Sequence, residues 1–200
     1  MRSLIQGAPT GLPAIAVMWT GFLIFLIAFL SARRRAGTEE RGNATRSRRS
    51  VVGIVVQGSG IGLAAAGLRA PSLDPMSAAA LVPAVVAAIL MAAAIWLFVW
   101  ATRTMGRNWS LVARTRDDHR LVEDGPFAYL RHPIYTAMFL ILIALAFALG
   151  HMARLWLCVP LFAIGTWLRI GEEERLLRTM FGAAYDGYAA RVRRFVPGVC

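Results

Sequence analysis

The chain has 200 residues, of which 58% are hydrophobic, and its formal net charge at pH 7 is +11. Apolar residues at this density, gathered in long runs, exclude an ordinary soluble domain and indicate a membrane protein. No lysine occurs, so Schiff-base chemistry and a lysine general base are excluded. We interpret the positive charge as membrane topology and attraction to anionic lipid head groups, with no nucleic-acid partner.

Five apolar runs follow one another along the chain, at residues 13–32, 51–68, 77–102, 134–149 and 153–170. Each approaches or reaches the ~20 residues that a helix needs to cross a bilayer. The first run ends in Arg33-Arg34-Arg35, which is typical of a stop-transfer anchor and not of a cleaved signal peptide. The fold class predicted is all-α: an integral membrane bundle of about five transmembrane helices, followed by a C-terminal amphipathic cytoplasmic helix.

The arginines predict the orientation of this bundle. Nineteen lie in the loop 33–50, in the segment 103–131 and after residue 168, whereas the other side would carry only Arg2, Arg69 and Arg154. This bias predicts an N-terminus outside and a C-terminus in the cytoplasm. Five spans require that same parity.

Residues 1–102 form the first predicted region, with three spans and the basic cytoplasmic loop 33–50. The second span contains Gln57, Ser59 and several glycines, at positions 53, 58, 60, 62 and 67. Small and hydrogen-bonding residues suit close helix packing, which we favour over a substrate path. The run Gly58-Ser-Gly60-Ile-Gly62 lies inside a span, so it does not predict a Rossmann cofactor site.

Residues 103–200 form the predicted catalytic region, with a connector, a helical hairpin at 134–170 and a last helix at 172–195. Trp109 in the connector is interpreted as an interfacial anchor in preference to a pocket wall. Gly150-His151 predicts a tight outside turn, so spans four and five form an antiparallel hairpin. The two cysteines, Cys158 and Cys200, indicate neither a disulfide nor a metal site, and Cys200 lacks a prenylation signal.

The last predicted helix begins at an acidic triplet, Glu172-Glu173-Glu174, and ends among arginines. Apolar and aromatic residues recur at steps of three and four from Leu177 to Phe195, so this helix is amphipathic and can fold over the polar mouth of the bundle. A break is expected at Gly182. Acidic residues in a first turn also stabilise the helix dipole, so helix capping is an alternative role for the glutamates.

A dense polar cluster lies at the start of the fourth span, where Tyr129, Arg131, His132 and Tyr135 sit at the membrane edge. Ionisable groups there are costly and indicate function. The hairpin brings this cluster to the glutamates, which predicts a pocket. A free amino-acid carboxylate would take Arg131 or His132 as donors, and an ammonium or ribose diol would take a glutamate, so the pocket suits a zwitterionic cofactor. No metal-ligand spacing occurs, so no metal is predicted.

Two motifs carry a resemblance to a known family. The first is Gly125-Pro-Phe-x-Tyr129-x-Arg131-His132-Pro133-x-Tyr135, and the second runs from Glu173-Glu174 to Arg191-Val192. Together, over about residues 104–197, they resemble the isoprenylcysteine carboxyl methyltransferase family, which is related to phospholipid N-methyltransferases, and this chain is similar to a short bacterial-type member.

The resemblance implies S-adenosylmethionine as cofactor, bound at the cytoplasmic mouth beneath the last helix. It implies cofactor contacts from Gly125, Pro126, Tyr129, Arg131, His132, Pro133, Tyr135, Glu173 and Glu174. It implies catalytic roles for Arg191, Tyr188 and His132, with Arg193 and Arg194 turned to lipid head groups or solvent. The tail lacks the proline that directly follows the valine in eukaryotic members, so the acceptor end of the site is left open.

The expected acceptor is a lipophilic small molecule or a prenylated substrate, met in membrane lipid, and most simply the carboxylate of an isoprenylcysteine-like compound. A carboxylate with a pKa near ~3.5 is already ionised and needs no general base, whereas a phospholipid amine or a thiol would need one. Two other classes remain as alternatives: a sterol-reductase-like membrane enzyme that uses NADPH, and a non-catalytic membrane interaction protein.

Overall fold

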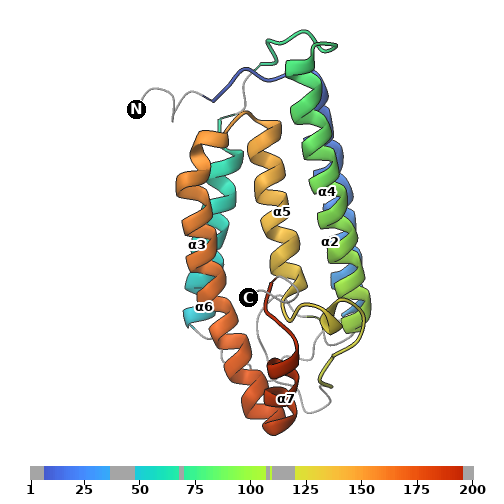
Figure 1. Cartoon of the computed structure of the whole chain (residues 1–200), viewed down its shortest axis with the longest axis vertical. Helices are drawn as coiled ribbons and strands as arrows, with labels where there is room; N and C mark the ends of the chain where they lie inside the picture. The colour runs from blue at the N-terminus through green and yellow to red at the C-terminus, as the bar shows by residue number, and fades with distance from the viewer. Residues whose placement is uncertain (1–6, 37–47, 68–69, 107–108, 110–119, 196–200) are drawn as a thin grey trace.

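The computed structural model describes residues 7–36, 48–67, 70–106, 109 and 120–195. Five long helices form a bundle in it (Figure 1): α2 (Leu12–Arg35), α3 (Arg48–Ala65), α4 (Ala78–Met105), α5 (Pro133–Ala148) and α6 (Leu155–Phe181). The shorter elements are η2 (Gly125–Ala128), η3 (Met152–Arg154) and α7 (Ala183–Arg191). Across the described ranges, β structure is limited to two isolated bridges. The all-α prediction is confirmed.

The five long helices correspond to the five predicted spans. Among the described residues, three segments are long and apolar enough to cross a membrane by themselves: Leu12–Arg35, Ala78–Met105 and Met152–Phe181. α5 is a shorter apolar helix, and α3 begins with two arginines. Large apolar side chains such as Trp19, Leu23 and Trp156 are exposed on the outer faces. Lipid is the solvent that can cover such faces, so the chain is an integral membrane protein.

α5 and α6 run in opposite directions from the turn at Gly150-His151, as the hairpin prediction requires, but each packs mainly on another helix. α5 packs along α4, which also contacts α2, whereas α6 packs along α3. α5 and α6 therefore touch over only a short stretch and separate toward the end of the bundle that carries α7 (Figure 1). This separation leaves room for a cavity.

Glycines bring α3 and α6 into backbone contact. A Cβ built on Gly165 of α6 would lie 2.3 Å from the backbone nitrogen of Gln57, and one on Gly53 would lie 2.6 Å from Cγ of Arg169. A Cβ on Gly60 would lie 2.9 Å from the carbonyl oxygen of Cys158 in α6, whereas Gly58 and Gly62 face open space. The packing prediction is therefore confirmed at positions 53 and 60 and is wrong at 58 and 62.

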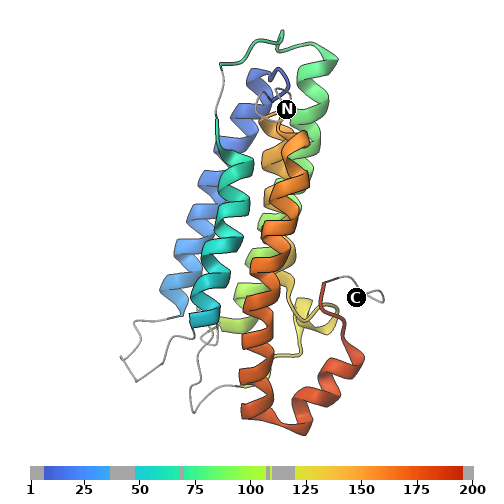
Figure 2. The ribbon, with the colours of Figure 1, turned by 90° about the vertical axis from the view of Figure 1, so that its left-hand side faces the viewer.

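The C-terminal part differs from the predicted separate helix over 172–195. α6 continues through Gly171 to Phe181, because a single glycine costs a helix only about 1 kcal/mol and its neighbours here favour helix. The chain turns at Gly182, as expected, with φ of +51°. α7 then folds back beneath the bundle (Figure 2) and ends at Arg191.

Residues after α7 run beside the segment that precedes α5. The backbone N–H groups of Arg131 and His132 donate to the carbonyls of Arg193 and Arg194, at 2.8 and 3.0 Å. These bonds tie the tail to the first motif. Residues 37–47 of the predicted basic loop, and Cys200, lie outside the described residues.

The two ends of the bundle differ in chemistry. At one end, the N–H of Ala8 donates to the carbonyl of Gly150 at 2.8 Å, so the N-terminal segment lies on the α5–α6 turn. At the opposite end lie the last turn of α2, with three arginines, together with η2 and α7 (Figure 1). The two sequence motifs thus meet at the arginine-rich end.

Candidate functional site

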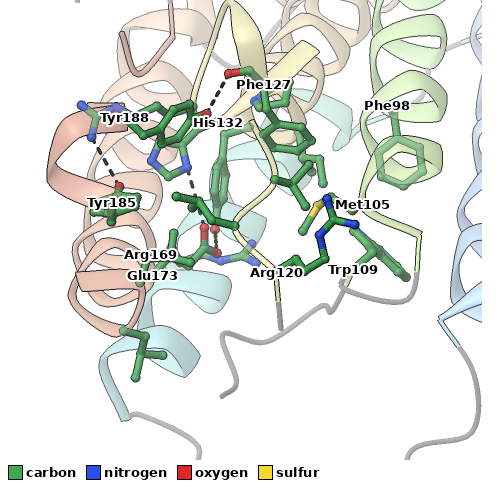
Figure 3. Close-up of a pocket in the computed structure, with 18 of the residues that line it drawn as sticks. Phe98, Met105, Trp109, Arg120, Phe127, His132, Arg169, Glu173, Tyr185 and Tyr188 are labelled. Atoms are coloured by element: carbon green, nitrogen blue, oxygen red, sulfur yellow. Dashed lines mark hydrogen bonds and ion pairs between the residues drawn. The ribbon is translucent and has the colours of Figure 1, made fainter. Parts of the chain in front are cut away.

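A cavity of about 300 Å³ lies at the arginine-rich end of the bundle, where α5 and α6 separate (Figure 3). α2, α4, α5, α6, α7 and the segment around η2 all contribute to its walls. One side is apolar, with Phe25, Phe29, Phe98, Met105, Trp109 and Met138. The other is polar, with Arg131, His132, Tyr135, Arg169, Glu173, Tyr185 and Tyr188.

The apolar side is built around Trp109. This side chain is buried and meets the rings of Phe29 and Phe98 edge-on, with centroid separations of 5.7 and 6.3 Å. Trp109 is therefore a wall of the cavity, and its interpretation as an interfacial anchor is wrong. Sequence reasoning also missed Phe25 and Phe29, because aromatic residues inside an apolar run give no signal that separates a cavity wall from a lipid contact.

The polar side is organised by Glu173 of α6. The hydroxyl of Tyr135 donates a short hydrogen bond to its carboxylate, and Nδ1 of His132 lies 3.8 Å from the other oxygen. The Arg169 guanidinium stacks over the Tyr135 ring, 5.0 Å from its centroid. Arg169 was counted only as a topological charge in the sequence, because it ends an apolar run. The structure places it in the cavity wall.

Glu174 lies behind this wall and does not line the cavity. Its carboxylate is 1% exposed and accepts hydrogen bonds from Arg131 at 2.9 Å and from both Nε and Nη2 of Arg194, at 2.9 and 2.8 Å. Nε2 of His132 lies 3.2 Å from the same carboxylate. Neighbouring positions on a helix point about 100° apart, so Glu173 faces the cavity and Glu174 faces the arginines behind its wall. Of the pair predicted to hold a cofactor, only Glu173 reaches the cavity.

Arg194 is partly buried and forms an ion pair with Glu174, in contrast to the expected position among lipid head groups or in solvent. The extended tail beside residues 130–132 brings it there. Its two-point contact with a carboxylate is the geometry that guanidinium groups favour. Hydrogen bonding to Glu174 raises the pKa of Arg194 further, so the pair stays charged.

Two tyrosines of α7 close the cavity from below. Tyr188 donates its hydroxyl to the carbonyl of Phe127 at 2.8 Å, which fastens α7 to η2. Arg131 donates to the Tyr185 hydroxyl at 3.4 Å. Burial raises the pKa of both tyrosines, and the charge of Glu174 adds to the effect at Tyr185. Both hydroxyls are therefore neutral at physiological pH.

Other residues from the predicted site lie outside the cavity. Tyr129 is 61% exposed on the outer face, beside the ring of Trp100. Arg191 forms an ion pair with Glu123, at 2.7 Å, between two exposed side chains. Neither contact points into the cavity, so the expected roles of Tyr129 at the cofactor and Arg191 at the acceptor do not fit this geometry.

Gly125 and Pro126 do not line the cavity, but they fix the backbone of η2 beside it. Gly125 has φ of +59°, and a Cβ there would lie 2.6 Å from Oγ1 of Thr104, so only glycine lets η2 approach α4 this closely. Pro126 is buried in η2 and is absent from the cavity lining. These two residues place Phe127, while Pro133 at the start of α5 does line the cavity, as predicted.

Metal binding has no structural support in the described ranges, which contain no group of three or more His, Cys, Asp or Glu side chains able to hold an ion. The polar groups that line the cavity include the guanidinium groups of Arg120, Arg131 and Arg169, the imidazole of His132 and the carboxylate of Glu173. The arrangement can bind a ligand that carries both charges and an apolar part.

Comparison with known proteins relates this site to membrane methyltransferases. The sequence profile of the phospholipid methyltransferase family matches residues 82–184. The protein-S-isoprenylcysteine O-methyltransferase of Schizosaccharomyces pombe is 35% identical over 98 residues, which cover 46% of this chain and 40% of that protein. Protein-S-isoprenylcysteine O-methyltransferase B of Arabidopsis thaliana is 35% identical over 106 residues, covering 48% and 50%. The matches thus span about half of these relatives or less.

A solved structure shares the fold. The eukaryotic intramembrane Ras methyltransferase ICMT, an isoprenylcysteine carboxyl methyltransferase, superposes with a TM-score of 0.54 at 19% sequence identity. The superposition covers 94% of this chain and 68% of that one. The likeness therefore includes α2 and α3, which lie outside the residues that the family profile matches.

Proposed function

Because this chain belongs to the phospholipid methyltransferase family, we propose that it is an integral-membrane methyltransferase that uses S-adenosylmethionine and acts on a lipophilic acceptor. The observation that carries the proposal is the two-sided cavity, charged toward α6 and α7 and apolar toward α2 and α4. The proposed acceptor is the carboxylate of an isoprenylcysteine-like compound, since relatives are named for methylating isoprenylcysteine.

The polar side fits the proposed cofactor. S-adenosylmethionine carries an ammonium group and a carboxylate, and the wall offers the carboxylate of Glu173 and the guanidinium of Arg131. Nε of Arg131 is buried without a hydrogen-bond partner among the described residues. A volume of about 300 Å³ lies at the lower end of the usual range for small-molecule sites.

The residues of this chain act by binding, orienting and excluding water. The bound cofactor would supply an electrophilic methyl group. A carboxylate acceptor is ionised near neutral pH and needs no proton removed. Tyr185 and Tyr188 are neutral and hydrogen-bonded, so they position groups and do not act as bases. The apolar wall keeps water away from opposite charges that disappear during transfer, which favours the reaction.

The apolar side suits the hydrocarbon part of the acceptor. Phe25, Phe29 and Phe98 belong to helices whose outer faces contact lipid, so a prenyl-like chain would pass from lipid to an aromatic wall without meeting water. We also propose that the arginine-rich end, with the cavity and the C-terminus, lies in the cytoplasm and that the N-terminus lies outside.

Calorimetric titration of the detergent-purified protein tests the cofactor. We expect saturable binding of S-adenosylmethionine and none of NADPH. Binding of NADPH alone would support the sterol-reductase-like alternative, and binding of neither would favour a non-catalytic interaction protein.

The pH dependence of methyl transfer between pH 5 and 9 tests the acceptor. A prenylated cysteine carboxylate should give a kcat/KM that stays flat down to about pH 5, because its pKa is near ~3.5. A phospholipid amine would instead give activity that rises with pH, since the amine must lose a proton first. Such a rise, with no transfer to the carboxylate, would replace the isoprenylcysteine-like acceptor with an amine.

A further inference from the structure

A buried polar chain connects α3 to the cavity wall. Nη1 of Arg169 donates to Oε1 of Gln57 at 2.7 Å, and Nε2 of Gln57 donates to Oγ1 of Thr166 at 2.7 Å. Gln57 is 1% exposed and Arg169 is 7% exposed. A guanidinium only donates, so the carbonyl oxygen of Gln57 faces it and the amino group of Gln57 faces the hydroxyl of Thr166.

The aliphatic part of the Arg169 side chain is packed as closely as its guanidinium. A Cβ on Gly53 would lie 2.6 Å from Cγ of Arg169, so the α3 backbone packs directly on this side chain. The guanidinium stacks on the face of Tyr135, while the hydroxyl of that ring donates to Glu173. Arg169 and Glu173 therefore occupy defined, separate places in the same wall.

Arg169 lies one helical turn before Glu173, so it is about 6 Å nearer the middle of the bundle. That direction leads toward the lipid-covered part of α6, from which a lipophilic acceptor would approach. Gln57 contacts the guanidinium through a neutral oxygen, so this contact fixes the position of the guanidinium without adding a negative charge to it. The positive charge of Arg169 attracts an anion and repels an ammonium group.

We propose that Arg169 binds the anionic group of the acceptor, and that Gln57 is the positioning residue that holds Arg169 for this contact. The proposal rests on the proposed methyltransferase function with its carboxylate acceptor, and it adds the residues that recognise the carboxylate. It gives α3, which contributes no residue to the cavity lining, a defined part in substrate selection.

The test compares a prenylated cysteine with a blocked amino group and its methyl ester, which differ only in the anionic charge. Binding of each compound, and of S-adenosylmethionine, is measured by calorimetry on the detergent-purified full chain. Arg169→Gln should weaken binding of the carboxylate about 10- to 150-fold, the loss typical of a charge-assisted hydrogen bond, and leave the ester and the cofactor within twofold.

Two variants of Gln57 examine its positioning role. Gln57→Glu keeps the shape of the side chain but places a carboxylate on Arg169, so it should weaken binding of the acid about tenfold or more and spare the ester. Gln57→Leu should raise the KM for the carboxylate while the affinity for S-adenosylmethionine is retained. Ser59→Ala is the matched control, because Ser59 is exposed on the same helix and its hydroxyl donates locally to Val56. It should change none of these values.

Equal losses for the acid and the ester in Arg169→Gln and Gln57→Glu would overturn the proposal, as would unchanged binding of the acid in both. A wild-type protein that binds S-adenosylmethionine but favours the ester or an amine over the acid would overturn the roles of Arg169 and Gln57 alone. Failure of the wild type to bind S-adenosylmethionine would count against the methyltransferase function itself. The comparison of acid and ester binding can be made without the cofactor, so the two failures are distinguishable.

Discussion

Replacing Glu174 by glutamine should destabilise the protein by about 3–5 kcal/mol, the usual cost of leaving one side of a buried ion pair without its partner. Glu174 is 1% exposed, and its carboxylate has four cationic or ionisable side chains at 2.8 to 3.8 Å, those of Arg131, His132, Arg178 and Arg194. Arg131 is 11% exposed at its side chain, so water cannot replace the lost charge there. Arg194 is 32% exposed and contributes less, because solvent can reach it.

Thermal unfolding of the detergent-purified variant measures this effect. For a chain of this size, about 3–5 kcal/mol corresponds to a Tm lowered by roughly 6–20 °C. Asp186→Asn is the matched control, since Asp186 pairs with Arg178 at 3.1 Å but both side chains are at least half exposed. Its effect should stay within about 1 kcal/mol, as for other surface ion pairs.

The reasoning fails if Glu174→Gln keeps the wild-type Tm and loses affinity for S-adenosylmethionine. That result would place Glu174 on the ligand and not within the supporting cluster. A Tm that falls equally in Glu174→Gln and Asp186→Asn would also contradict it, because burial would then have no influence on the cost.

Three further outcomes are expected. Glu173→Gln should weaken S-adenosylmethionine binding about 10- to 150-fold with little change in Tm, and calorimetry showing full affinity would remove Glu173 from the cofactor site. Gly165→Ala places a methyl group 2.3 Å from the facing backbone of α3, so it should lower the free energy of unfolding by about 1–3 kcal/mol, whereas Gly58→Ala, which faces open space, should not. Reporter fusions after Arg49 should be cytoplasmic and fusions at Gly150 should not; the reverse pattern would invert the proposed orientation.

The amino-acid sequence by itself determined the class of this protein and the place of its chemistry. Long apolar runs form helices in lipid, because a helix provides every backbone polar group with a hydrogen-bond partner within its own segment. Charged and aromatic residues at the start of one span and the end of the next are visible without coordinates, and they do meet. His132, Arg131, Tyr135 and Glu173 were found this way.

Only the tertiary structure decided which of these side chains face the cavity. Glu173 and Glu174 are adjacent and chemically identical, and the rotation of about 100° between helix positions directs one to the cavity and the other into an ion cluster. The same applies to the arginines of the tail: Arg194 pairs with the buried Glu174, whereas Arg191 stays on the surface. Local sequence carries no information on this choice, because it depends on how the tail packs beside residues 130–132.

The contribution of the first three helices also required the fold. Phe25 and Phe29 are ordinary residues of an apolar run, and Gln57 resembles a packing residue of a glycine-rich helix. The role of each residue depends on a helix distant in sequence. Phe25 and Phe29 of α2 line the cavity beside α4, and Gln57 of α3 accepts a hydrogen bond from Arg169 of α6. Periodicity predicts which segments are helices, but the partners of a helix in a bundle depend on side-chain packing between segments up to 112 residues apart.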